Sequence, residues 1–123
     1  MAYGDGVFVA VTYSNTTNNA ARSEDGGRTW EPVGIPNTGW YDVSYGDGVF
    51  VTVDQDAASD KAARSEDGGK TWTETTLPSS NSWSSVAYGN GVFVVFGENK
   101  AARSEDGGKT WTEATLPVSG TWA

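Results

Sequence analysis

The sequence predicts an all-β chain made of three similar units, each a sheet of four short antiparallel strands. The first observation is a repeat: the segment Ser23–Trp30 returns at Ser65–Trp72 and at Ser104–Trp111, after intervals of 42 and 39 residues. The second is that the apolar runs are short and rich in β-branched and aromatic residues. The third is that no segment shows the periodicity of a helix. Together these observations exclude a helical repeat.

The third unit shows the four expected strands most plainly. A first strand is expected over Trp83–Tyr88 and a second over Val92–Phe96, joined by an Asn-Gly turn. Asn-Gly between apolar runs is a strong hairpin signal, because a type I′ turn needs positive φ at both central residues. A third strand is expected over Lys100–Arg103 and a fourth over Lys109–Thr112, on either side of a second turn. The first two units follow the same order.

The length of the unit identifies its architecture. A repeat of roughly 40 to 45 residues with four strands is typical of one blade of a β-propeller. We therefore expect three four-stranded antiparallel blades per chain, with the ring completed by oligomerisation. The units are blade 1 (1–39, its first strand incomplete at the N-terminus), blade 2 (40–82) and blade 3 (83–121). Residues 122–123 would start a further first strand, completed by the N-terminus of another chain.

The repeated segment has the pattern Ser-x-Asp-x-Gly-x-Thr-Trp in all three copies. This pattern resembles the Asp-box, or BNR repeat, of sialidase-like β-propellers, and similar blades occur in the photosystem II assembly factor family, sortilin-type receptors and some glycoside hydrolases. The resemblance implies a structural turn, in which the aspartate hydrogen-bonds its own backbone, the glycine takes a restricted backbone angle and the tryptophan covers the turn. The residues are Ser23, Asp25, Gly27, Thr29, Trp30, Ser65, Asp67, Gly69, Thr71, Trp72, Ser104, Asp106, Gly108, Thr110 and Trp111. The near-identical copies also suit an engineered repeat or one excised from a longer protein.

Composition excludes several classes of function. The chain has neither Cys nor His, which excludes disulfides, thiol nucleophiles, the usual zinc sites and His-dependent triads. Its net charge of −8 disfavours nucleic acid and anionic membranes as partners. No apolar run is long enough to cross a bilayer and no signal peptide is recognised, so we expect a soluble protein of unknown localisation. No cofactor and no metal is expected.

An enzyme of the sialidase type would need two positioned catalytic groups and converging arginines. Arg22, Arg64 and Arg103 precede the three boxes. Three copies of one blade position form a ring rather than a clamp, so we expect these arginines to pair with carboxylates or to bond across the blade interface. Asp42 is the one first-strand carboxylate without a counterpart in the other units. One differentiated carboxylate is too little for a reaction, and the chain is predicted not to be an enzyme.

Three blades leave two apolar sheet faces in water, and apolar faces of that size indicate an interface. The chain starts at Met1, Ala2 and Tyr3, which match the end of a first strand, and it ends at Trp122 and Ala123, which match its start. We expect these five residues to lie at the interface of a head-to-tail homo-oligomer. A homodimer with six blades is favoured, a homotrimer with nine blades is the alternative, and a fragment that does not close is the third possibility.

Binding of a glycan or a peptide is the alternative function. Trp40, Trp83 and Trp122 would start the first strands, beside the face where propellers usually hold ligands. An indole suits stacking on a sugar ring. In the other interpretation, each of these tryptophans wedges between neighbouring blades.

One loop gathers three carboxylates, those of Asp54, Asp56 and Asp60. Ca²⁺ prefers oxygen ligands of this kind. The loop lacks the spacing of an EF-hand and occurs in one unit only, so no metal site is assigned to it.

Overall fold

The structure is a computed structural model that describes residues 1–13, 19–36, 39–55, 59–97 and 100–115. Trp122 and Ala123, which the sequence places at an interface, lie outside the described residues. The same holds for Asp56 of the acidic loop.

The described residues form strands and no helix, which confirms the all-β prediction. The strands are β1 (Ala2–Gly4), β2 (Val7–Val11), β3 (Ala20–Ser23), β4 (Glu31–Val33), β5 (Trp40–Gly46), β6 (Val49–Asp54), β7 (Ser59–Ser65), β8 (Thr73–Asn81), β9 (Ser85–Gly89), β10 (Val92–Phe96), β11 (Lys100–Ser104) and β12 (Thr112–Thr115). Nothing in the described ranges could therefore cross a bilayer as an apolar helix.

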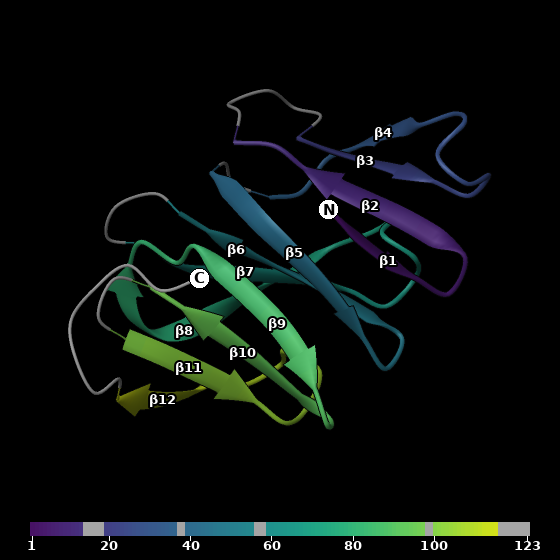
Figure 1. The fold of residues 1–123 in the computed structure, drawn as a ribbon. Coiled ribbons are helices and arrows are strands. Elements are labelled where there is room, and N and C mark those ends of the chain that lie inside the picture. The colour runs from purple at the N-terminus through teal and green to yellow at the C-terminus, as the bar shows by residue number, and fades with distance from the viewer. Residues whose placement is uncertain (14–18, 37–38, 56–58, 98–99, 116–123) are drawn as a thin grey trace.

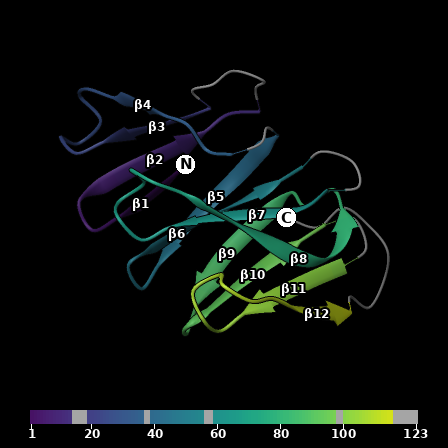
Figure 2. The same ribbon diagram turned by 180° about the vertical axis from the view of Figure 1, so that it is seen from behind.

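The strands form three four-stranded antiparallel sheets in which neighbours pair in chain order. Blade 1 is β1-β2-β3-β4, blade 2 is β5-β6-β7-β8 and blade 3 is β9-β10-β11-β12. The three sheets follow one another in an arc, with blade 2 between blades 1 and 3 (Figure 1). β5 contacts both β1 and β9, so the blades meet along their first strands. Seen from behind, blades 1 and 3 lie at opposite ends of the arc (Figure 2).

A two-residue turn with positive φ at both positions closes the first hairpin of every blade. The φ angles are 53° and 82° at Asp5 and Gly6, and 52° and 82° at Asn90 and Gly91. Aspartate, asparagine and glycine tolerate this left-handed region better than other residues do. The local sequence therefore fixes the turn, and the turn fixes the register of the first two strands.

Side-chain alternation along each second strand gives a blade two different faces. Val7 and Val9 of β2 point to one side, here called the front face, while Phe8 points to the opposite side, the rear face. The front face of blade 1 packs on the rear face of blade 2, where Val9 and Phe50 share one buried cluster. The front face of blade 2 packs in the same way on the rear face of blade 3, in a second buried cluster. The apolar core thus lies between the sheets, and each blade depends on its neighbours for burial.

The fourth strand begins later than the sequence predicts. The prediction for blade 3 is Lys109–Thr112, whereas β12 spans Thr112–Thr115. The cause is the preceding turn, because the carboxylate of Asp106 accepts hydrogen bonds from the backbone N–H groups of Lys109 and Thr110. These bonds hold the chain in the turn, so pairing with β11 starts only at Thr112.

Removing a tryptophan between blades tests where the stability comes from. Trp40→Ala is expected to lower the free energy of unfolding by about 3–5 kcal/mol, because it deletes a fully buried indole and leaves a cavity. Urea denaturation followed by circular dichroism measures the change. Tyr41 is the matched control, since its side chain is 53% exposed, and Tyr41→Ala should change the free energy by less than about 1 kcal/mol. Equal losses in the two variants would contradict this packing.

Candidate functional site

The box turns, residues 23–30, 65–72 and 104–111, are each closed by hydrogen bonds that their own serine and aspartate accept. In blade 1, Asp25 Oδ1 accepts from the N–H of Thr29 at 2.9 Å and from the Ser23 hydroxyl at 2.8 Å. Asp25 Oδ2 accepts from the Thr29 hydroxyl. Ser23 Oγ accepts from the N–H of Gly27 at 2.9 Å, and the indole N–H of Trp30 donates to the Gly27 carbonyl at 3.0 Å. The turn is therefore held by its own side chains.

Blades 2 and 3 repeat this network. The N–H to carboxylate distance is 2.9 Å both from Thr71 to Asp67 and from Thr110 to Asp106. Every residue type of the sequence motif takes part in each copy. The residues of the second and third networks are Ser65, Asp67, Gly69, Thr71, Trp72, Ser104, Asp106, Gly108, Thr110 and Trp111.

These hydrogen bonds keep the box carboxylates ionised. Bonds from the threonine of the turn, first from its hydroxyl and then from its N–H, lower the pKa of Asp25 to about 2 and bring the pKa of Asp106 well below its usual range. Burial acts to raise the pKa of Asp67, but the bonds from its threonine and serine outweigh burial and the pKa is lowered. A carboxylate without a proton at neutral pH is no general acid there, so these groups act as acceptors within the turn.

Arginines that precede the boxes link neighbouring blades. Arg22 donates from Nε to the carbonyl oxygen of Gly68 at 2.8 Å, and Arg64 donates from Nε to that of Gly107 at 2.7 Å. In each case the donor belongs to one blade and the acceptor to the box turn of the next, and we call this contact the arginine latch. Bonding across the blade interface, expected from the sequence, is confirmed for both residues. The two guanidinium groups bind different blades and do not converge as a substrate clamp would.

The charge of Arg22 is balanced where it is buried. Its side chain is only 3% exposed. Burial opposes the charged form, but hydrogen bonds to Glu24, at 2.6 Å, and to Glu31 outweigh burial and raise the pKa of the guanidinium. The same pairing lowers the pKa of Glu24. A latch therefore brings a paired charge into the interface rather than a lone one.

Two glycines set how closely neighbouring first strands approach. A Cβ atom at Gly4 would lie 2.0 Å from the ring of Tyr45 in blade 2, and one at Gly46 would lie 2.0 Å from the ring of Tyr88 in blade 3. No side chain fits beneath either ring, so glycine is required. This tyrosine–glycine contact is not among the sequence predictions, although its signal is the Tyr-Gly pair before every first hairpin turn, at 3–4, 45–46 and 88–89.

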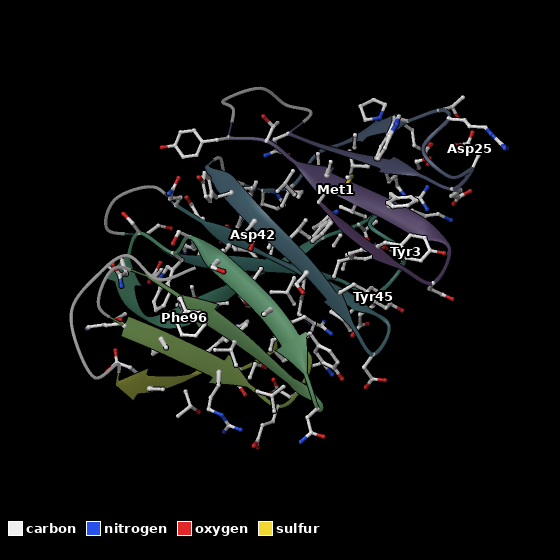
Figure 3. The ribbon with its side chains drawn as sticks, viewed as in Figure 1. Met1, Tyr3, Asp25, Asp42, Tyr45 and Phe96 are labelled. Atoms are coloured by element: carbon white, nitrogen blue, oxygen red, sulfur yellow. The ribbon has the colours of Figure 1, made fainter. Side chains whose placement is uncertain are left out.

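Asp42 joins the first strands of blades 2 and 3 (Figure 3). Its Oδ2 accepts from the N–H of Val86 in β9 at 3.0 Å, and its Oδ1 accepts from the N–H of Val43 at 3.0 Å. The one differentiated carboxylate of the sequence is thus used as a bridge between blades.

The structure corrects the ligand-stacking role expected for Trp40 and Trp83. Both side chains are 0% exposed and lie in the two clusters between blades. Neither indole offers a face to a sugar ring. The reason is that first strands are where neighbouring blades meet, and the other interpretation, a wedge between blades, describes their position.

Trp30 departs from the buried cover that the sequence predicts for every box. Its side chain is 42% exposed, whereas that of Trp72 is 9% exposed. The front face of blade 1 covers Trp72, but no described residue of another blade covers the rear face of blade 1. Burial of the box tryptophan therefore requires a preceding blade.

The two described carboxylates of the acidic loop have different surroundings. Asp54 is buried, while Asp60 is half-buried and lies 3.7 Å from the ammonium group of Lys61. Within the described ranges no three acidic groups gather as a cation site.

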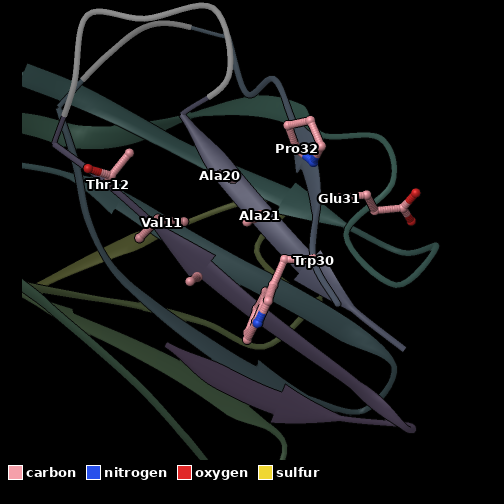
Figure 4. A pocket seen from close by; sticks show the side chains of 8 residues that line it. Val11, Thr12, Ala20, Ala21, Trp30, Glu31 and Pro32 are labelled. Carbon is pink, nitrogen blue, oxygen red and sulfur yellow. The ribbon is translucent and has the colours of Figure 1, made fainter. Parts of the chain in front are cut away.

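The rear face of blade 1 is the first candidate interaction surface. Tyr3 is 58% exposed, and Phe8 is half-buried where its equivalent Phe50 is fully buried. Beside them lies a mostly apolar cleft of about 360 Å³ under Trp30 (Figure 4). The cleft is lined by Ala10, Val11, Thr12, Ala20, Ala21, Trp30, Glu31 and Pro32.

The front face of blade 3 is the second candidate surface. Val94 is half-buried, although its equivalents Val9 and Val51 are fully buried. The Arg103 side chain is 44% exposed and pairs with Glu105 of its own box at 2.8 Å. The residues that form a latch and a buried face in blades 1 and 2 are thus present here without a described blade against them.

Comparison with known proteins supports the fold. A solved structure described as YCF48 bound to D1 peptide matches with a TM-score of 0.66 at 19% identity. The match covers 96% of this chain and 46% of that one, so the chain spans about half the length of this β-propeller neighbour. No family model matches the chain, and no curated protein matches it.

The low pKa of the box aspartates predicts acid sensitivity. An unfolded aspartate titrates near about 3.9, whereas the pKa of Asp25 in the fold is about 2. The unfolded state therefore binds protons first, and the stability from this group, fully present above about pH 5, is lost as the pH falls toward 2. Urea midpoints between pH 7 and pH 2 should drop for the wild type, and Asp25→Asn should flatten part of that slope.

A turn aspartate provides the control for this measurement. Asp47→Asn removes a carboxylate at a position where blade 3 already has Asn90. If Asp25→Asn changed the slope no more than Asp47→Asn does, the box carboxylate would not be the source of the acid sensitivity.

Proposed function

We propose that the chain is a non-catalytic building block of a β-propeller, whose ring closes by head-to-tail association of copies. A homodimer with six blades is the favoured ring and a homotrimer with nine blades is the alternative. One observation carries the proposal: no described residue of another blade covers the rear face of blade 1 or the front face of blade 3, whereas the equivalent faces between blades are buried. The chain already forms a front-to-rear interface twice, between blades 1 and 2 and between blades 2 and 3. The two free faces are of the same two kinds, one front and one rear. Such a heterologous contact gives a closed ring when its rotation closes.

The apolar area of the free faces favours association. Tyr3 and Trp30 are exposed large side chains, whereas at the equivalent positions of blades 2 and 3 Trp72 is buried and the other three aromatic residues are half-buried. Burying a large apolar side chain contributes roughly 1.5–3 kcal/mol. Several such side chains at each end are enough to offset part of the entropy lost when two copies associate.

A structural role also accounts for the groups that resemble catalytic ones. The box aspartates close their turns, Asp42 bridges two strands and Arg22 and Arg64 form latches. Each of these charged groups already has its hydrogen bonds within the blades. This use of the charged residues supports a scaffold rather than an enzyme.

Peptide binding is the second candidate function. The name of the structural neighbour states that it was solved with a peptide, and the apolar cleft under Trp30 is open in a single copy. A peptide in that cleft and a second copy on the rear face of blade 1 would exclude each other. The two candidates therefore predict opposite effects of self-association on peptide binding.

Native mass spectrometry and light scattering across a dilution series test ring closure. The expected mass is two or three times 13.0 kDa, returning toward a single chain on dilution. Trp30→Glu should shift the equilibrium to the single chain, because it places a charge on the free rear face. Tyr41→Glu, at an exposed aromatic residue away from both free faces, should leave the mass unchanged. A folded wild type that stays at 13.0 kDa at the highest concentration would refute the proposal.

A fluorescein-labelled D1 peptide tests the second candidate. Saturable anisotropy at chain concentrations below those of self-association would support peptide binding in the cleft, provided that Trp30→Glu abolishes it and that it falls again where the chains associate. No saturable change, in a sample dilute enough to hold single chains, would refute peptide binding in the cleft and favour the scaffold alone.

A further inference from the structure

Resting on the proposed ring closure, we infer the register of the contact between copies: the front face of blade 3 meets the rear face of blade 1 of a second copy as neighbouring blades meet inside one chain. Arg103 forms the latch with the Gly26 carbonyl of the second copy, and the ring of its Tyr3 covers Gly89. Val94 packs on its Gly27. The partner is thus a second copy of this chain, and each contact is assigned to a named residue pair.

The arginine latch is the first observation behind this register. It occurs at both internal interfaces, with Nε to carbonyl distances of 2.8 Å and 2.7 Å. Arg103 occupies the same position of blade 3, and its exposed guanidinium has no such acceptor among the described residues. Gly26 occupies the position of Gly68 and Gly107 and shares their positive φ, at 78° against 76° for both. One donor and one acceptor of the same kind are therefore left at opposite ends of the arc.

The tyrosine–glycine contact also leaves one glycine and one tyrosine without such a partner among the described residues. Two of the three Tyr-Gly pairs in the sequence supply Gly4 with Tyr45 and Gly46 with Tyr88. The remaining members are Gly89, where an added Cβ would meet nothing within 4 Å, and Tyr3, which is 58% exposed. They lie on blade 3 and blade 1, as the register requires.

The box glycines give a third pair. An added Cβ at Gly69 would lie 2.8 Å from Val9 of the preceding blade, and one at Gly108 would lie 3.1 Å from Val51. An added Cβ at Gly27 would lie 3.7 Å from Trp30 of its own turn. Val94 is the valine left without a glycine opposite it.

The charges repeat in the same register. Lys70 of blade 2 acts on Glu24 of blade 1, and Lys109 of blade 3 acts on Glu66 of blade 2, each helping to hold the acidic partner ionised. The third pair would be Glu105 with Arg28, the position at which the boxes differ in sequence while keeping the positive charge. The proposed contact therefore brings opposite charges together at Glu105 and Arg28.

Gly89→Val tests the register because the change is harmless in one chain. An added Cβ meets no described residue within 4 Å there, and φ at Gly89 is outside the left-handed region. Against a second copy it would collide with the ring of Tyr3, as a side chain at Gly46 would with Tyr88. Sedimentation equilibrium should show association at least about tenfold weaker than in the wild type. Thr73→Val, at an exposed position of β8, is the control and should associate as the wild type does.

A compensating change makes the test specific for the residue pair. Tyr3→Ala removes the ring with which the valine would collide. Gly89→Val should therefore weaken association much less when it is added to Tyr3→Ala, giving the double variant, than when it is added to the wild type. Arg103→Ala provides an independent variant and should also weaken association, whereas Lys100→Ala, which removes an equal charge from the same blade, should not. Circular dichroism verifies that each variant is folded.

The outcomes separate the register from ring closure. A wild type that stays a single chain refutes the proposed function. A wild type that associates while Gly89→Val and Arg103→Ala associate equally well refutes the register and leaves the function standing. Loss of association in Gly89→Val without recovery in the double variant refutes the pairing of Tyr3 with Gly89.

Discussion

The close approach of one sheet to the next is the constraint on which the rest of the structure depends. A tyrosine ring of one blade lies directly on the backbone of a glycine in its neighbour, at a distance that no Cβ atom would permit. This contact brings the front and rear faces together so that Val9 and Phe50 are fully buried in a shared cluster. A single four-stranded sheet has no such cover, so a blade is stable only through its neighbours.

The box turn matters to this interface because it presents a hydrogen-bond acceptor. Hydrogen bonds among serine, aspartate and threonine hold the turn in one conformation. The carbonyl oxygen of Gly68 in that turn then accepts a hydrogen bond from Arg22 of the preceding blade. Positive φ at Gly68, 76°, belongs to the turn geometry that positions this carbonyl. A motif that looks like a group of catalytic carboxylates therefore acts through the backbone oxygen that it positions.

Much of the fold could be predicted from the sequence, because the decisive signals are local. The Asp-Gly and Asn-Gly turns and the short apolar runs specify the hairpins, and the repeat specifies three similar sheets. The start of the fourth strand was mispredicted, because side-chain hydrogen bonds of Asp106 compete with strand pairing. The roles of the candidate site residues were harder to predict, because the burial of a side chain depends on which blade lies against it. Trp40, a candidate for ligand stacking, is enclosed between blades, whereas Trp30, expected to be buried over its turn, is 42% exposed because no described blade lies against it.

The two ends of the arc have the same residues as the interfaces within it, so copies of the chain should join as neighbouring blades do. The most direct measurement is an isotope-filtered NOE experiment on a mixture of ¹³C,¹⁵N-labelled and unlabelled chains. Cross-peaks are expected between the Tyr3 ring protons of one chain and the Gly89 α-protons of another. Spectra in which Gly89 shows contacts only within its own chain, at a concentration where the mass is oligomeric, would contradict this expectation.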